Sequence, residues 1–190
     1  MSEGNIKKAI IIGDELLVDF DYDKIKDEDI ISTVFDHDKN LYPHYLVSVD
    51  PNDEDYELDE VKKLIDEEKC QGFFLSKKIL TNYPELKEKD NIIYIEDFIA
   101  QRCNPFQYLL SYSSQSVCIM FAMLLGFNKV DVLGMNNFND YEHKNWEHLV
   151  FTLTGYTYLN KFQMNVYVWN NEELAMGADK YFTKKDISLF

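Results

Sequence analysis

The sequence predicts an α/β protein built on a mostly parallel, doubly wound sheet of about six or seven strands. Short apolar runs typical of strands alternate with helical patterns along the whole of the 190-residue chain. Residues 113–138 read as an apolar helix, a glycine, a buried strand and a polar cluster, which is a unit of such a sheet. The first run, residues 7–12, ends in three isoleucines without polar alternation, as expected of a central parallel strand.

Five segments in the first half of the chain predict strands, because each is a short apolar run: 7–12, 30–35, 45–49, 72–75 and 91–95. An amphipathic helix is expected over about 55–68, where apolar side chains recur at helical spacing at Leu58, Val61, Leu64 and Ile65. A second helical segment is expected between the last two of these strands, around residues 79–86.

The central unit begins with Ser113 and Ser114, whose hydroxyls are suited to cap a helix N-terminus. Every residue from 117 to 125 is apolar, which is typical of a helix covered on both sides. Gly126 is then expected to end the helix in the left-handed conformation. Residues 130–133 predict the buried strand that follows.

The rest of the chain completes the pattern. Apolar side chains at helical spacing mark residues 146–156, and residues 165–169 predict a last strand. We therefore assign residues 1–180 to a single Rossmann-like α/β domain and residues 181–190 to a C-terminal tail.

Composition and charge limit the classes of function that the chain can have. Hydrophobic residues make up 46% and aromatic residues 15% of the chain, as in a folded globular protein. The formal charge of −15 is uneven, because residues 1–100 hold 26 acidic and 12 basic side chains, whereas residues 101–190 hold 8 and 7. This acidity disfavours direct binding of nucleic acid. A solvated surface is the simpler interpretation; the alternatives are a surface that meets a basic partner or one that mimics nucleic acid.

The sequence predicts no membrane span, because no apolar run reaches the ~20 residues that a bilayer requires. The apolar run at residues 9–12 is too short for a signal peptide. Three cysteines, Cys70, Cys103 and Cys118, are odd in number and far apart, which favours neither a disulfide framework nor a zinc site. We therefore expect a reducing, cytoplasmic setting.

Polar residues gather around the central unit. Asn136 and Asn137 follow the strand at 130–133, at the edge where ligands of open α/β sheets bind. Ser113, Ser114 and Gln115 open the helix, where free N–H groups suit an anion. Plain helix caps and turn formers are the simpler interpretation of these residues. Gly13, directly after the first strand, is a further candidate, because a glycine there lets the backbone approach a ligand. The two carboxylates that follow it count against a glycine-rich loop that cradles phosphate.

Two histidines, His143 and His148, precede or open the predicted helix at 146–156. Their separation of five does not match the i,i+4 spacing of a zinc-binding helix, so no metal site is predicted. His148 lies off the apolar stripe of this helix. It is therefore either a surface residue or a general acid or base in a cleft.

The central segment SSQSVCIMFAMLLGFNKVDVLGMNN resembles the bacterial sialyltransferase-like α/β family and the related domain of archaeal 6-hydroxymethylpterin pyrophosphokinase. The matching residues are Ser114, the Leu-Gly-Phe at residues 125–127 and Gly134. The opening strand with its following residues and the closing strand at 165–169 are also similar. The resemblance implies a nucleotide or nucleotide-sugar ligand, with Ser114 touching the donor and His148, or less well placed His143, taking a proton from an acceptor hydroxyl.

The departures from this family fall on its functional positions. Gly13-Asp14-Glu15 replaces the family's nucleotide loop, Gln115 replaces a glycine and Asn136 replaces an aspartate. Two hypotheses follow. The chain is a glycosyltransferase-like, nucleotide-binding protein whose catalysis is either retained or lost, or it is a non-catalytic module on the same scaffold whose acidic surface engages a basic partner.

Overall fold

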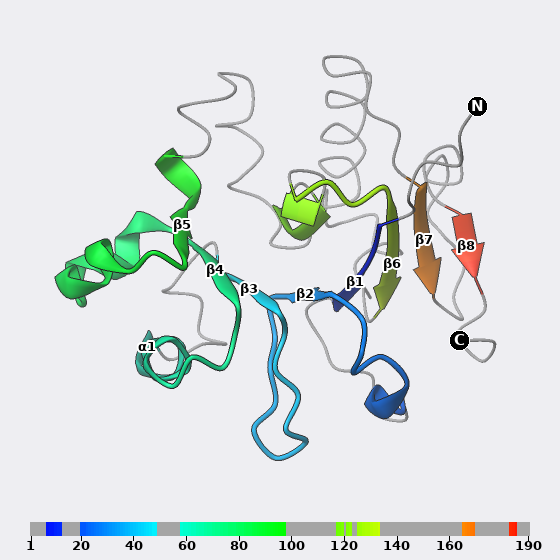
Figure 1. Cartoon of the computed structure of the whole chain (residues 1–190), viewed down its shortest axis with the longest axis horizontal. Helices are drawn as coiled ribbons and strands as arrows, with labels where there is room; N and C mark the ends of the chain where they lie inside the picture. The colour runs from blue at the N-terminus through cyan, green and yellow to red at the C-terminus, as the bar shows by residue number, and fades with distance from the viewer. Residues whose placement is uncertain are drawn as a thin grey trace, which may run out of the picture.

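The computed structural model describes residues 7–12, 20–48, 58–97, 117–119, 121–122, 125–133, 165–169 and 183–185. The described strands form one sheet of eight in the order β5-β4-β3-β2-β1-β6-β7-β8 (Figure 1). They are β1 (Lys8–Ile12), β2 (Ile30–Ser32), β3 (Tyr45–Ser48), β4 (Gly72–Leu75), β5 (Ile92–Tyr94), β6 (Lys129–Leu133), β7 (Asn165–Trp169) and β8 (Thr183–Lys185). Every neighbouring pair is parallel, which confirms the predicted α/β class.

The sheet holds one strand more than the six or seven expected. Its eighth strand, β8, pairs with β7 through Tyr167–Thr183 and Trp169–Lys185. These residues lie in the range that the sequence analysis assigned to a C-terminal tail. This strand was not predicted, because Thr183-Lys184-Lys185 has no apolar pattern. It is identified by its pairing with β7.

The second strand is shorter than expected and ends at Ser32 rather than at residue 35. The N–H of Val34 donates to the Ser32 Oγ atom over 2.9 Å, so the backbone turns back on a side chain. Ser32 accordingly closes the strand, because a short hydroxyl side chain competes with the ladder for nearby backbone groups.

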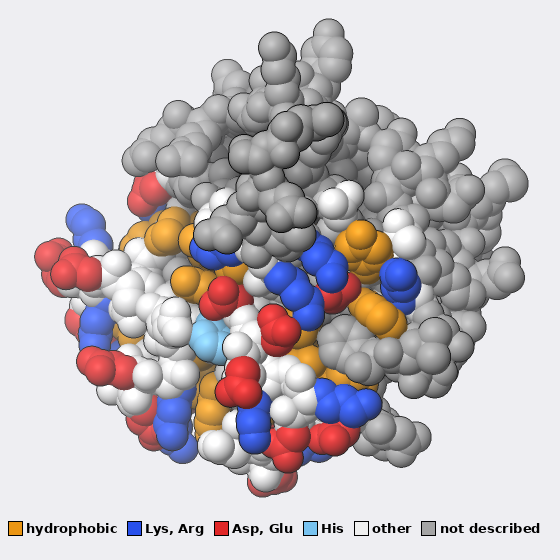
Figure 2. All heavy atoms as spheres, turned by 45° about the vertical axis from the view of Figure 1, so that its right-hand side comes forward, with side chains coloured by type: hydrophobic (Ala, Val, Ile, Leu, Met, Phe, Trp, Pro, Cys, Tyr) orange, Lys and Arg blue, Asp and Glu red, His pale blue; other side chains and the backbone are white. Residues whose placement is uncertain are grey.

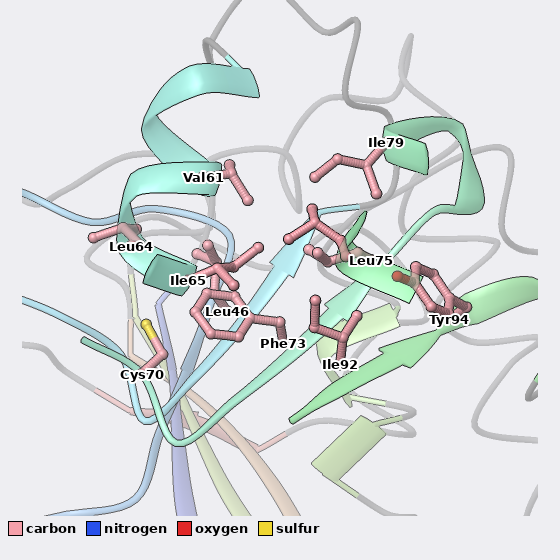
Figure 3. Packing of buried hydrophobic residues seen from close by; sticks show 11 residues of the cluster. Leu46, Val61, Leu64, Ile65, Cys70, Phe73, Leu75, Ile79, Ile92 and Tyr94 are labelled. Carbon is pink, nitrogen blue, oxygen red and sulfur yellow. The ribbon is translucent and has the colours of Figure 1, made fainter. Parts of the chain in front are cut away.

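One face of the sheet is covered by α1 (Leu58–Asp66), where a helix was predicted. Its buried residues Val61, Leu64 and Ile65 pack on alternate residues of the neighbouring strands, as Figure 3 shows. The strand residues in this cluster are Leu46, Phe73, Leu75, Ile92 and Tyr94. The acidic first turn, with Asp59 and Glu60, suits the positive end of the helix dipole.

The helical segment expected at 79–86 forms two 3₁₀ helices, η2 (Lys77–Thr81) and η3 (Pro84–Glu88). Pro84 explains the break, because proline has no N–H to donate and its ring clashes with a preceding helical turn. Ile79 and Leu86, one from each helix, are buried in the α1 cluster. A third 3₁₀ helix, η1 (Tyr22–Lys24), lies between β1 and β2 in the chain.

The opposite face is covered by the predicted central helix. Residues 117–119 and 121–122 are helical and buried, which agrees with the expectation of a fully covered helix. The Phe121 ring stacks on Phe74 with centroids 4.4 Å apart and meets the edge of Tyr45 at 5.7 Å. Since Phe74 and Tyr45 alternate with the strand residues beneath α1, this helix and α1 lie on opposite faces (Figure 1).

Gly126 ends this helix as predicted, with a φ of +83°. The Phe127 N–H donates to the Ala122 carbonyl over 3.0 Å, the long closing bond of a Schellman motif. Lys7 then donates from Nζ to the Leu125 carbonyl over 3.1 Å and lies 4.1 Å from the centre of the Phe127 ring. The end of the helix is thereby tied to the chain entering β1.

Candidate functional site

The carboxyl edge between β1 and β6 is the candidate site. The chain moves outward from β1 to β5 on one side and from β6 to β8 on the other, so the strand order reverses between β1 and β6. These strands are in register from Lys8–Lys129 to Ile12–Leu133, and their carboxyl ends therefore lie side by side. Ligands of open α/β sheets bind outside the carboxyl ends of the strands at such a reversal.

The chain continues from these strand ends toward the predicted site residues. Ile12 directly precedes Gly13, and Leu133 precedes Asn136 by three residues. All the predicted site residues lie outside the described part of the chain: Gly13, Ser113, Ser114, Gln115, Asn136, Asn137, His143 and His148. Their assignment to this edge stays a prediction.

Ser32 is a polar side chain at the carboxyl end of β2, the strand next to β1. It is fully buried, and its Oγ donates to the carbonyl of Ile12, the last residue of β1, over 3.3 Å. The same Oγ accepts from Val34 N–H, so both of its functions are used. Ser32 thus holds the end of β1 against the end of β2 and acts as a support for the edge.

A second polar group occupies the far end of this edge. Ser76, which follows β4, donates from Oγ to Glu96 Oε1 over 2.7 Å. The Glu96 carboxylate also accepts from the Lys77 N–H, at 3.0 Å to Oε1 and 2.9 Å to Oε2. The Lys77 ammonium pairs with Asp97. Glu96 therefore fastens the start of η2 to the end of β5.

Hydroxyl residues end or follow three successive strands, β2, β3 and β4, at Ser32, Ser48 and Ser76. None of the three was among the predicted site residues. The positions of Ser48 and Ser76 were readable from the sequence, because each lies within one residue of the end of a predicted strand. That of Ser32 was not, because it lies inside the strand predicted at 30–35. All three are buried, and Ser32 and Ser76 bind neighbouring backbone or side chains. The described part of the edge is thus neutral near the reversal and acidic at β5.

Tyr94 lies beneath the acidic end, at the last position of β5. Its hydroxyl is buried and has no hydrogen-bond partner among the residues that the structure describes. Burial first, and the charge of Asp97 second, raise the pKa of Tyr94. The phenol therefore stays protonated at neutral pH and is no candidate base.

The two described histidines serve the fold. His44, just before β3, accepts the Ile30 N–H at Nδ1 over 3.2 Å and so helps to start β2. His37 lies in the turn bridged by Asp36 and Leu41, and its Nδ1 is 3.0 Å from the Tyr42 hydroxyl. His44 is at the amino edge of the sheet, away from the candidate site.

The described cysteines are core residues. Cys118, expected in the core, is fully buried, and Cys70 belongs to the α1 cluster. Burial raises the pKa of the Cys70 thiol to about 12. Because the thiolate is the nucleophilic form, Cys70 is unsuited to covalent catalysis at neutral pH.

The described residues show neither a metal-binding cluster nor a membrane-spanning helix. They contain no cluster of three His, Cys, Asp or Glu side chains placed to hold a metal ion. None of their helices has the length and apolar character to cross a membrane. Across the whole chain, comparison with protein-family models, curated proteins and solved structures finds no match.

Proposed function

We propose that this chain binds a nucleotide or a nucleotide sugar at the carboxyl edge between β1 and β6, as a glycosyltransferase-like protein. The observation that carries the proposal is the reversal of strand order in an all-parallel sheet, because ligands of open α/β sheets bind outside the carboxyl ends of the strands at such a reversal. The resemblance of residues 113–138 to sialyltransferase-like proteins supplies the ligand class. Ser114 and Asn136 are the residues assigned to the donor.

Binding can be tested by thermal unfolding with a panel of nucleotides and nucleotide sugars. A ligand at a hundredfold excess over its Kd adds about 2.7 kcal/mol to the free energy of unfolding and raises the melting temperature. We expect Ser114→Ala and Asn136→Ala to reduce this shift. Ser48→Ala, which removes a hydroxyl at the end of β3, two strands away from the reversal, should keep it. A panel without any shift would contradict the proposal.

Catalysis is a separate question with a separate readout. If the chain transfers a sugar, His148 takes a proton from the acceptor hydroxyl, and His143 is the second candidate for this role. Release of free nucleotide from a bound nucleotide sugar should then fall about 10²–10⁴-fold in His148→Ala. Binding with no turnover in the unaltered protein would indicate a scaffold that has kept its ligand and lost its chemistry.

A non-catalytic interaction module is the second candidate. It is favoured by the exposed acidic residues on and after α1, namely Asp59, Glu60, Asp66, Glu67 and Glu68. Of these, Asp66 pairs with Lys62 and Lys89, and Glu67 pairs with Lys63, so a partner would have to replace those contacts. A basic partner would pair with this surface in a salt-dependent way. Turnover of a nucleotide sugar, lost in His148→Ala, would rule this candidate out.

A further inference from the structure

Strand β6 has two unlike faces. Val130 and Val132 are fully buried on one face. The other face carries Lys129 and Asp131, in register with Asn165 and Tyr167 on β7, and ends at Leu133, which is buried in a cluster with Ile10 and Ile12. Parallel strands that are covered on both faces are apolar on both. The charged residues therefore mark a polar face over the amino-terminal part of these strands, whereas the carboxyl end of the same face belongs to the core.

The polar face continues onto β8 and reaches solvent. Asn165 and Thr183 are exposed, whereas Lys129, Tyr167 and Lys185 are half-buried. We call these five residues the Tyr167 face. In Figure 2, which brings the side of the molecule with β7 and β8 forward, basic side chains lie beside hydrophobic ones, with acidic side chains among them.

The carboxylate beneath this face is already compensated. Asp131 is 2% exposed and accepts the Trp169 indole N–H at Oδ1 over 2.8 Å. Its Oδ2 lies 3.3 Å from the Lys8 ammonium and 3.9 Å from that of Lys129. The negative charge is thus buried, while 37% of the Lys129 side chain remains exposed above it.

Two lysines flank one aromatic ring on this face. The ammonium groups of Lys129 and Lys185 lie 5.2 Å and 5.4 Å from the centre of the Tyr167 ring. Lys185 has no carboxylate partner among the residues that the structure describes. The ring positions both charges, and a local positive surface results in a chain of net charge −15.

We propose that the Tyr167 face binds an acidic peptide segment of a partner protein. Carboxylates of the segment pair with Lys129 and Lys185, and an apolar or aromatic side chain of the segment packs on Tyr167. Tyrosine is one of the side chains enriched in protein-binding hot spots, which supports Tyr167 as the anchor. A nucleic acid is the less favourable polyanion, because the −15 chain repels a long, dense charge more than a few carboxylates.

The test measures fluorescence anisotropy of a short fluorescein-labelled peptide of alternating glutamate and tyrosine. We expect saturable binding that weakens as salt is added, because exposed charges are screened. The double variant Lys129→Gln, Lys185→Gln should bind about tenfold more weakly, as expected for the loss of two exposed charge pairs. Tyr167→Ser should also weaken binding. Unchanged circular-dichroism melting curves would show that these variants are folded.

The control variant is Lys69→Gln. Lys69 is an exposed lysine that lies 5.0 Å from the Tyr42 ring, so it has the same type of contact elsewhere on the molecule. It should bind the peptide as the unaltered protein does. Equal weakening by Lys69→Gln, equal affinity for a glutamine-for-glutamate peptide, or no binding of the acidic peptide would each overturn the proposal. Tighter binding of an oligothymidylate of matched charge would overturn it in favour of nucleic acid.

Discussion

The two ends of the sheet differ in how their faces are used. From β3 to β4 the strands are apolar on both faces, with α1 packed on one and Phe121 of the central helix on the other. On β6 one face carries the buried Val130 and Val132, whereas the other carries Lys129 and Asp131 beside Tyr167 of β7 and becomes apolar only at Leu133. Parallel pairing is continuous across both regions. Parallel pairing therefore does not require that both faces of a strand are buried. In this sheet the strands are parallel throughout, but burial of both faces varies from one end to the other.

The largest effect is expected from Phe74→Ala, in the two-sided region. Phe74 is fully buried and stacks on Phe121, so its truncation leaves a cavity between strand and helix. Truncation of a buried phenylalanine costs about 3–5 kcal/mol of unfolding free energy. Urea unfolding measures this directly. If Phe74→Ala lost no more unfolding free energy than Tyr167→Ala, the two regions would not differ in burial as described.

A smaller effect is expected from Asp131→Ala, beneath the Tyr167 face. The variant leaves the Trp169 indole N–H and the Lys8 ammonium without this acceptor, although Lys8 keeps Glu28 at 3.2 Å. Loss of a hydrogen bond to a charged group costs about 1.5–3 kcal/mol. Asp131→Asn should cost less, because its amide oxygen still accepts from Trp169. If urea unfolding showed Asp131→Ala to be stabilising, the carboxylate would not compensate the lysines as described.

The smallest effect is expected from Tyr167→Ala. The ring is half-buried and its partners are lysines at 5.2 Å and 5.4 Å, which remain hydrated after truncation. Each such contact is worth about 0.5–1 kcal/mol at an exposed site, so the total loss should stay well below that of Phe74→Ala. The same urea measurement applies. A loss equal to that of Phe74→Ala would mean that this face is buried like the other.

Much of the fold could be predicted because its signals are local. The apolar runs at 7–12, 72–75 and 165–169 form strands within a residue of the expected bounds. Gly126 ends its helix in the left-handed conformation, because a residue without a Cβ adopts that backbone freely. The short strand β8 has no such pattern and depends on β7 for its identity.

The candidate site likewise has a part that the sequence predicts and a part that only the structure shows. The alternation of strands and helices predicted a parallel, doubly wound sheet but no order of its strands. The reversal between β1 and β6, which locates the carboxyl edge, comes from the structure. The eight residues assigned to the edge lie outside the described part of the chain, so their roles stay predictions. The support from Ser32 to Ile12 and the bond from Ser76 to Glu96 each join residues 20 positions apart. No local pattern in the sequence indicates such pairs.

The sequence by itself determined the class of the fold, the approximate bounds of its longer elements and the end of the central helix. These depend on side-chain periodicity and on backbone preference, which act over a few neighbouring residues. Only the tertiary structure decided that Asp131 meets Trp169 and Lys8, and that Tyr167 lies between Lys129 and Lys185. Those contacts exist because strand pairing brings together residues that are far apart in the sequence.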